Sequence, residues 1–543
     1  MKRFLWLGFV LFLYVMCAAC GETFRPIIIP NPPTFPNPAA AHTVVSINDN
    51  GTVVPGSAMV IDVSGNTDVS VADVGLAPVY AVQQSASGIL VVNHSVTGAA
   101  ADSLTRLNFS GTAIGTTTTI SLPPNSGPNF VAVAPSATTA YVTLPNYAPP
   151  SVGVVSTLSG AMVNTITVGN NPDAIGVTPD NSKLYVANQG SSSISAFNTL
   201  DRSPRTINGS FNAPLWLIAR SDSQRLYVLN GTTGSPQDGV VSTIDTTSTA
   251  GPDNVIDASV SAPGAAYMLY DGNLNRLYIP GGSQLTILDV SQSTPVVLAG
   301  GPIAIPPVLP SARTQGDVCS TFSPGAVTAA AVAALPDGSR AYVGSYAEFQ
   351  VNVTITGAAL TSSGASTTTY NYTLSPGTPD LLPGMVITIS NVDSTGLNPS
   401  NNPPSDFDGT FTILSAGGGA FAVTNAPTDN YISGGTGAAP NMCPQVTVID
   451  TTSNTIETPS IAIPGFPAYD SFCSTTRFRF MMAAGGDSSR AYLSSCDGGN
   501  VNIIDTSSET YILNLAAPVS SRPPIPPNPQ NPPQNPVFLI AGP

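Results

Sequence analysis

A tyrosine motif that recurs along most of this chain limits the folds open to it. In five places a tyrosine follows Lys or Arg by two residues and precedes an aliphatic residue: Tyr185, Tyr227, Tyr278, Tyr342 and Tyr492. Segment 139–142 lacks only the cation, and segment 88–91 lacks the tyrosine as well. The steps from Tyr141 to the next three tyrosines of the motif are 44, 42 and 51 residues. A period of this length indicates an array of repeated supersecondary units.

Each repeat has the pattern of four short strands. Turns rich in Asp, Asn, Gly and Ser, such as 179–182 and 336–339, precede most of the tyrosine motifs, and these residue types tolerate tight hairpins. Apolar runs lie on both sides of the motif, as at 174–177 and 193–197. Alternation with a period of two favours strands, and no stretch after the N-terminal leader has a helical period. Four antiparallel strands in every forty to fifty residues predict an all-β fold, a β-propeller.

The repeat also resembles a known family. Residues 170–175 (NNPDAI), 178–180 (TPD) and 183–188 (KLYVAN) are similar to the YVTN-type β-propeller repeat of bacterial and archaeal extracytoplasmic and surface proteins. The likeness is closest over 160–200 and extends more loosely over most of 43–518. It implies a propeller outside the cytoplasm, and it implies no particular ligand, because one propeller can host many kinds of site.

The number of repeats predicts the number of blades. Full units begin near Pro78, Pro128, Pro172, Pro214, Pro263, Gly325 and Pro467, and a partial unit spans 42–75. The partial unit lacks a first strand, so we expect a strand from elsewhere, either 537–540 or 26–29, to complete it and remove an exposed edge. We therefore expect eight four-stranded blades. The alternative is seven blades with the N-terminal unit packed outside.

The N-terminus is predicted to be a targeting segment. Lys2 and Arg3 precede an apolar stretch at 4–16, so 1–19 is interpreted as a signal peptide. Residues 18–20 (AAC) resemble a bacterial lipobox, which implies lipidation of Cys20 and anchoring to the membrane, at the outer membrane or facing the periplasm. Plain secretion is the alternative. Residues 20–41 are rich in proline and are interpreted as a tether.

Four further cysteines predict disulfide bonds. Cys319, Cys443, Cys473 and Cys496 form an even set in an exported chain, and four cysteines allow three pairings. The repeat favours Cys319–Cys443 and Cys473–Cys496, because the first member of each pair precedes the first strand of a unit. The second member lies between the second and third strands, which places both at the same end of the blade. Four free thiols are the alternative.

One unit is interrupted by a long insert. After the motif at Tyr342 the next propeller strand is delayed until 446–450, and residues 349–441 contain strand-like runs of their own. Segments 383–389 and 407–413 are similar to a small β-barrel or sandwich module of some surface and phage proteins. We interpret the insert as a recognition module or as structural decoration.

The domain order follows from these boundaries. The first part of the propeller is 42–348, the insert is 349–441 and the last propeller strands are 442–518. A linker rich in Pro and Asn at 519–536 leads to the possible closing strand at 537–543.

Residues for catalysis are sparse. The two histidines, His42 in the tether and His94 after a strand, are too few for a metal cluster or a Ser/His/Asp site. Asp406 and Asp408 precede a glycine as in a calcium loop but lack the later ligands, so we interpret them as a solvated turn. We therefore predict no enzyme, metal or cofactor. Lactonases and the heavy subunits of amine dehydrogenases, which are similar propellers, supply an enzymatic alternative that requires an acidic cluster in the central channel.

The charge restricts the partners. The net charge is −15, and it becomes −17 once Lys2 and Arg3 leave with the leader, which argues against nucleic acid and anionic surfaces. The cations of the tyrosine motifs are predicted to pair with neighbouring turn aspartates. We expect a monomeric binding or scaffold protein of the cell envelope, with an unknown protein, glycan or envelope component as partner. A surface-layer or adhesion component is the further alternative.

Overall fold

The computed structural model of the protein describes most of the chain after its N-terminal segment. The described residues are 43–95, 102–231, 239–314, 317–320, 325–363, 368–376, 381, 385–395, 407–425, 430–457, 460–467, 473, 476–520 and 533–542. All of them belong to one compact unit, Pro38–Pro543. The predicted signal peptide, Cys20, the tether and His42 lie outside the described residues. No helix in the described part is long and apolar enough to cross a membrane.

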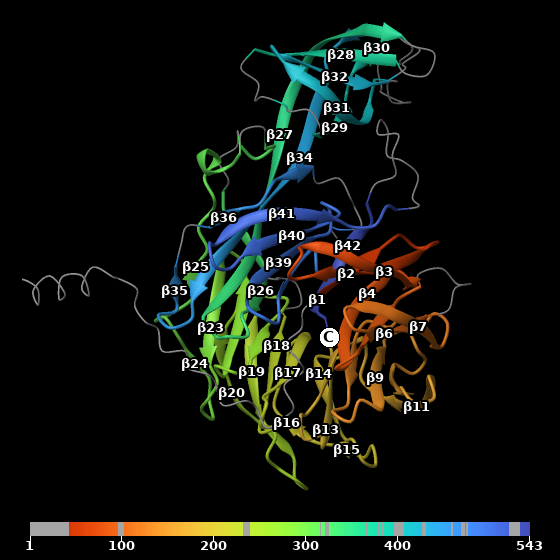
Figure 1. Ribbon diagram of the computed structural model, residues 1–543, viewed down its shortest axis with the longest axis vertical. Coiled ribbons are helices and arrows are strands. Elements are labelled where there is room, and N and C mark those ends of the chain that lie inside the picture. The colour runs from red at the N-terminus through yellow and green to blue at the C-terminus, as the bar shows by residue number, and fades with distance from the viewer. Residues whose placement is uncertain are drawn as a thin grey trace, which may run out of the picture. The chain divides into compact units, whose positions relative to one another are not determined.

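The fold is an all-β propeller, as predicted (Figure 1). Seven sheets of four or five strands are regular blades. Blade 1 contains β1 (Thr43–Asp49), β2 (Pro55–Asp62), β3 (Thr67–Leu76) and β42 (Asn535–Ala541). Blade 2 contains β4 (Pro78–Ser85), β5 (Gly88–Asn93), β6 (Ser103–Ser110) and β7 (Ala113–Ser121). Blade 3 contains β8 (Val131–Val133), β9 (Thr139–Leu144), β10 (Ser151–Ser156) and β11 (Ala161–Thr167).

The later blades repeat this order. Blade 4 contains β12 (Pro172–Val177), β13 (Lys183–Asn188), β14 (Ser193–Asn198) and β15 (Pro204–Arg205). Blade 5 contains β16 (Ile207–Asn208), β17 (Pro214–Ala219), β18 (Arg225–Asn230), β19 (Val240–Asp245) and β20 (Asp253–Ser261). Blade 6 contains β21 (Leu269–Asp271), β22 (Arg276–Gly281), β23 (Gln284–Asp289), β24 (Val296–Val297) and β25 (Ile303–Ala304). Blade 7 contains β38 (Phe480–Ala484), β39 (Arg490–Ser495), β40 (Asn500–Asp505) and β41 (Thr510–Ala516). A short 3-10 turn, Pro310–Ala312, follows blade 6.

A ten-stranded sheet stands between blades 6 and 7 in chain order. It contains β26 (Thr328–Ala334), β27 (Arg340–Ser363), β28 (Thr368–Leu374), β29 (Val386–Ser390), β31 (Gly409–Gly417), β32 (Ala420–Thr424), β34 (Thr436–Asp450), β35 (Thr455–Ile456), β36 (Ile461–Ala462) and β37 (Phe466–Pro467). Two further strands, β30 (Asp393–Ser394) and β33 (Tyr431–Ser433), pair with each other. The expectation of eight four-stranded blades is therefore wrong. The count of regular blades is seven, because the insert merges one repeat into this larger sheet.

The C-terminus completes the first blade. Strand β42 pairs antiparallel with β1, from Val44 opposite Ala541 to Asp49 opposite Asn535. The N-terminal unit is thus a blade within the ring, not a unit packed outside. Of the two candidate donor segments, 537–540 lies within β42, and 26–29 lies outside the described residues. The pairing leaves β1 without a free edge.

The insert forms a small closed barrel. Each of its six strands pairs with two neighbours in the cyclic order β27, β28, β32, β31, β29 and β34. Tyr372 and Phe421 are buried inside it, with ring centroids 5.1 Å apart and nearly parallel planes. Strands β27 and β34 also form part of the propeller, and their ladder is unbroken from Arg340 opposite Asp450 to Thr354 opposite Thr436.

The repeated tyrosines are core residues. Tyr185, Tyr227, Tyr278, Tyr342 and Tyr492 are at most 1% exposed. Four of their five cationic neighbours form ion pairs within the fold, but not with the turn that precedes them as predicted, and Arg276 instead donates to the Thr451 carbonyl. Arg225 and Arg490 pair with Asp245 and Asp505, which end the third strand of the same blade. Arg340 pairs with Glu457 and with Glu509 of blade 7.

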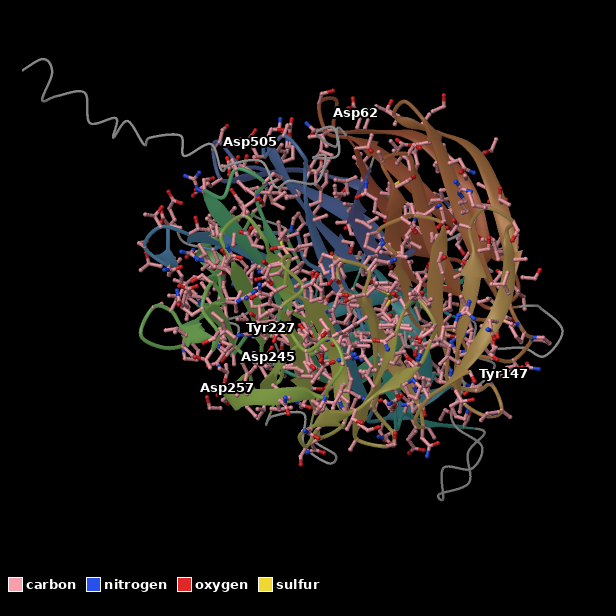
Figure 2. The ribbon with its side chains drawn as sticks, turned by 90° about the horizontal axis from the view of Figure 1, so that it is seen from below. Asp62, Tyr147, Tyr227, Asp245, Asp257 and Asp505 are labelled. Atoms are coloured by element: carbon pink, nitrogen blue, oxygen red, sulfur yellow. A yellow bond between two sulfur atoms is a disulfide. The ribbon has the colours of Figure 1, made fainter. Side chains whose placement is uncertain are left out.

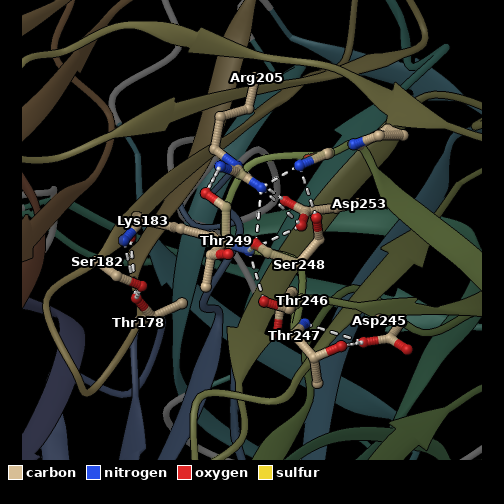
Figure 3. Close-up of polar contacts among 12 residues, drawn as sticks. Thr178, Ser182, Lys183, Arg205, Asp245, Thr246, Thr247, Ser248, Thr249 and Asp253 are labelled. Carbon is tan, nitrogen blue, oxygen red and sulfur yellow. Dashed lines mark hydrogen bonds and ion pairs between the residues drawn. The ribbon is translucent and has the colours of Figure 1, made fainter.

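Lys183 has the most buried of these environments (Figure 3). Its ammonium donates to Asp253 Oδ1 at 2.7 Å and to the Ser248 carbonyl at 2.8 Å. The Tyr185 hydroxyl donates to Asp253 Oδ2 at 2.7 Å, and Arg205 lies 3.3 Å from the same carboxylate. Asp253 belongs to blade 5 and its three partners to blade 4, so this network joins two neighbouring blades.

Candidate functional site

Both disulfides lie at one end of the blades, which we call the insert face. This is the end where first strands begin and where second strands connect to third strands. The sulfur atoms of Cys319 and Cys443 are bonded, as are those of Cys473 and Cys496, so the predicted pairing is confirmed. All four side chains are buried. The insert itself replaces a connection between a second and a third strand, so it belongs to the same face.

A bulge motif at the start of the first strands places aromatic rings at the centre of the propeller. The sequence Pro-x-aromatic occurs at 78–80, 128–130, 214–216 and 536–538. Pro78 and Pro214 pair with asparagines of the second strand, and in both blades the register shifts before the aromatic residue. A β-bulge of this kind redirects a side chain. The proline suits this position because the first residue of a strand need not donate to the ladder.

The central aromatic cluster consists of Tyr80, Phe130, Trp216, Tyr267, Phe478 and Phe538. Rings of non-adjacent blades touch, since the centroids of Tyr80 and Trp216 are 6.3 Å apart. Phe478 lies within 6.4 Å of four of the other rings. Five of the six side chains are at most 8% exposed. The cluster therefore fills the centre of the ring at this level.

One ion pair borders the central aromatic cluster. Arg477 Nη2 donates to Asp173 Oδ2 at 2.6 Å, and the guanidinium carbon lies 5.1 Å from the centroid of Phe130. Burial raises the pKa of Asp173, and the charge of Arg477 opposes that rise. Burial among the rings also raises the pKa of Tyr80 to about 12. In blade 4 the position two residues after Pro172, which holds an aromatic ring in the bulge motif, is occupied by Ala174.

Two buried donors lie in and beside the central aromatic cluster. Arg477 Nη1 and Trp216 Nε1 are buried and have no hydrogen-bond partner among the described residues. Buried donors of this kind are normally satisfied by ordered water. The centre of the propeller thus holds the six rings of the cluster and, at their border, the ion pair of Asp173 and Arg477. The acidic cluster on which the enzymatic alternative depends is not found among the described residues of the centre.

The other sequence candidates lie apart from this cluster. His94 is half-buried after β5, and its backbone N–H donates to the Ala77 carbonyl at 3.0 Å. Asp408 Oδ1 accepts a bond from the Val392 N–H at 3.0 Å, sixteen residues earlier in the chain, while Asp406 lies outside the described residues. Within the described ranges no three His, Cys, Asp or Glu side chains form a group that could hold a metal ion.

Three carboxylates of the blades are peripheral. Figure 2 places the side chains of Asp62, Asp257 and Asp505 toward the outside of the blades. Each accepts a hydrogen bond from a serine two residues further along, in a turn at Asp62 and Asp505 and within β20 at Asp257. These three carboxylates are thus used locally.

Arg479 contacts the base of the insert, where β27 leaves the blade. Arg479 pairs with Asp497 at 2.7 Å and with Glu348, which lies on β27 where this strand leaves the blade. Its guanidinium carbon is 5.9 Å from the ring centroid of Tyr346, also on β27. Arg477 and Arg479 flank Phe478, so the segment that supplies the central cluster also contacts the insert. Sequence reasoning missed this segment, and its signal is two arginines beside a phenylalanine just after Cys473.

A groove opens near the rim of the insert face between blades 4 and 5. Its volume is about 310 Å³, and it is lined by Ser192, Ser193, Ile194, Ile207, Gly209, Ser210 and Phe211. We call it the serine groove. None of its lining side chains is ionisable, unlike the centre of the propeller.

Comparisons with known proteins find distant structural likenesses and no sequence family. No protein-family model matches the chain, and no curated protein matches it. Among solved structures, apo AztD from Citrobacter koseri is 9% identical with a TM-score of 0.46, covering 92% of this chain and 98% of that chain. Hydrazine synthase of Kuenenia stuttgartiensis is 14% identical with a TM-score of 0.42, covering 79% and 96%. The periplasmic gluconolactonase PpgL of Pseudomonas aeruginosa is 13% identical with a TM-score of 0.39, covering 56% and 91%. These likenesses carry no argument about function.

Proposed function

We propose that this protein is a binding or scaffold protein of the bacterial cell envelope and that the barrel of the insert is its recognition module. The observation that carries the proposal is the unbroken ladder of β27 and β34, which extends one propeller unit directly into the barrel. Binding modules are commonly found where a variable segment is held by a rigid scaffold. The proposed role is binding without catalysis, by a monomer.

The base of the insert supports this role because it is held from two sides. The bond between Cys319 and Cys443 ties β34 to the segment that precedes β26. On the opposite side Arg479 connects Glu348 of β27 to Asp497 of blade 7. A module fixed in this way loses little conformational freedom on binding, which favours affinity.

An extracytoplasmic location fits the two disulfides, which persist in oxidising compartments. We further propose that the protein is a lipoprotein with a YVTN-type propeller and that it is anchored through Cys20. Replacing Cys20 with Ala should release the protein from membranes into the soluble fraction. Retention of the Cys20→Ala variant in washed membranes would contradict the anchor and leave the binding role untouched.

The register of the ladder defines a clean test of the insert. Phe349 stands opposite Asn441, and both are buried, so the cut belongs just beyond this pair. Replacing residues 350–440 with Asn-Gly joins the two strands by a tight hairpin and keeps Cys443 in place.

Both proteins, in the soluble form starting at Gly21, are then used to isolate partners from envelope extract. We expect the intact protein alone to retain its partners, with circular dichroism confirming that the shortened one is folded. Equal capture by the two proteins would show that the insert is structural decoration.

A further inference from the structure

The serine groove has the form of a small-ligand site. Its two sides come from different parts of the fold, the hairpin between β13 and β14 on one side and the segment that joins β16 to β17 on the other. A volume of about 310 Å³ lies at the small end of the range of ligand sites, about 300–1,000 Å³. The groove therefore has room for a ligand of one or two sugar-sized rings.

Buried asparagines fix both sides of the groove. Asn188 Nδ2 donates to Ser193 Oγ at 3.2 Å, and Asn188 is fully buried. On the other side, Asn230 Oδ1 accepts a bond from the Asn212 N–H at 3.3 Å, and Ser192 Oγ accepts one from the Ala213 N–H at 3.1 Å. These bonds hold the lining in one geometry before any ligand arrives, which reduces the entropic cost of binding.

Gly209 lets the linking segment approach the blade closely. A Cβ atom at this residue would lie 2.2 Å from Val255 Cγ2, so no larger residue fits without a shift. Its φ of +151° is also a conformation that L residues rarely adopt. The glycine thereby places its neighbours Ser210 and Phe211 along the groove.

The lining of the groove is uncharged and mostly polar. Phe211, Ile194 and Ile207 pack against the core between blades 4 and 5 and leave a small apolar area in the groove, and three serines supply hydroxyl groups. Ser210 is exposed, and its hydroxyl has no partner among the described residues. A pyranose ring has the complementary character, with an apolar C–H face and a rim of hydroxyls that donate and accept. An anionic ligand would find no cation among the lining residues and would approach a chain of net charge −15.

We propose that the serine groove binds a neutral saccharide, with the sugar face against Phe211 and its hydroxyls toward Ser192, Ser193 and Ser210. This site is separate from the insert and does not depend on what the insert binds. It gives the propeller its own contact with envelope or extracellular glycans.

The test uses three neutral disaccharides as probes: cellobiose, maltose and N,N′-diacetylchitobiose. Saturation-transfer NMR at about 5 mM detects a site with a dissociation constant near 1 mM, and titration calorimetry then gives the affinity. Ser210→Glu places a charge in the groove without touching the core, and the exposed Ser159→Glu in the β10–β11 turn is the matched control. Phe211→Ala removes the stacking surface.

We expect at least one disaccharide to bind, a loss of affinity of at least tenfold for Ser210→Glu and Phe211→Ala, and no change for Ser159→Glu. The protein with residues 350–440 replaced by Asn-Gly should bind the same sugar equally well, which separates this site from the proposed role of the insert. Absence of a signal with all three probes would overturn the proposal. Equal affinity of the Ser210→Glu variant would overturn it as well.

Discussion

Asp253 allows the sharpest test of how the blades are held together. Its side chain is fully buried and accepts bonds from Lys183 and Tyr185 at 2.7 Å each, with Arg205 at 3.3 Å. The two cations are themselves only 5–6% exposed. Replacing Asp253 with Ala removes the carboxylate that contacts both of these cations.

The expected loss in the free energy of unfolding follows from the burial of the charges. Breaking a buried ion pair by removing one partner costs about 3–5 kcal/mol, because an uncompensated charge remains in the interior. Asp253→Asn keeps an acceptor for Tyr185 and should cost less, about 1.5–3 kcal/mol, the range for hydrogen bonds to charged groups. Asp201→Ala is the control, since Asp201 is exposed and bonds only to Ser203 in its own turn.

Urea unfolding, monitored by tryptophan fluorescence, measures the change in stability. The chain has two tryptophans, Trp6 in the predicted leader and Trp216 in β17, so in the form starting at Gly21 the signal comes from Trp216 in the central aromatic cluster. With a slope of about 3 kcal/mol per molar urea, the Asp253→Ala midpoint should fall by about 1–2 M. A midpoint within about 0.2 M of the Asp201→Ala control would refute the claim that this network joins blades 4 and 5.

Three further predictions follow from other parts of the fold. Replacing Cys473 and Cys496 with Ser opens a loop with a sequence separation of 23 and should cost about 3 kcal/mol in thermal or urea unfolding, whereas an unchanged midpoint would show that the bond constrains little. Deleting residues 533–543 removes β42 and exposes the edge of β1, so size-exclusion chromatography should show aggregation, and a stable monomer would contradict the closing role of this strand. Hydrogen bonds from Ser507 and Ser508 and the charge of Arg490 lower the pKa of Asp505 to about 2, so its contribution to stability is complete above pH 4 and is lost as the pH falls toward 2. The stability difference between the wild type and Asp505→Asn should therefore shrink between pH 4 and 2, and a constant difference would show that the carboxylate does not titrate as stated.

The sequence predicts the propeller because the signals for this fold lie close together in the chain. Strand alternation, turn residues and the spacing of Tyr185, Tyr227 and Tyr278 all arise within one repeat. The disulfides were also predictable, since equivalent places in two repeats define one end of a blade. The same comparison of repeats located the insert between Tyr342 and Val446.

The features that sequence reasoning missed depend on contacts between different repeats. Lys183 bonds to Asp253, seventy residues along the chain, and no local spacing indicates that partner. The number of regular blades is seven because β27 and β34 continue into the barrel, which a count of motifs does not reveal. Four rings of the central aromatic cluster have a local signal, Pro-x-aromatic, but its meaning requires knowing that rings of six different units meet.

Photo-crosslinking in intact cells tests the proposed role of the insert most directly. A photoreactive amino acid at Thr410, exposed on the barrel, is compared with one at Thr117, exposed on β7 of blade 2. The full-length protein is used, so that its predicted anchor and its natural surroundings are retained. We predict a discrete adduct from Thr410 and none from Thr117. An adduct from Thr117 alone, or from neither position, would contradict the role of the insert as the recognition module.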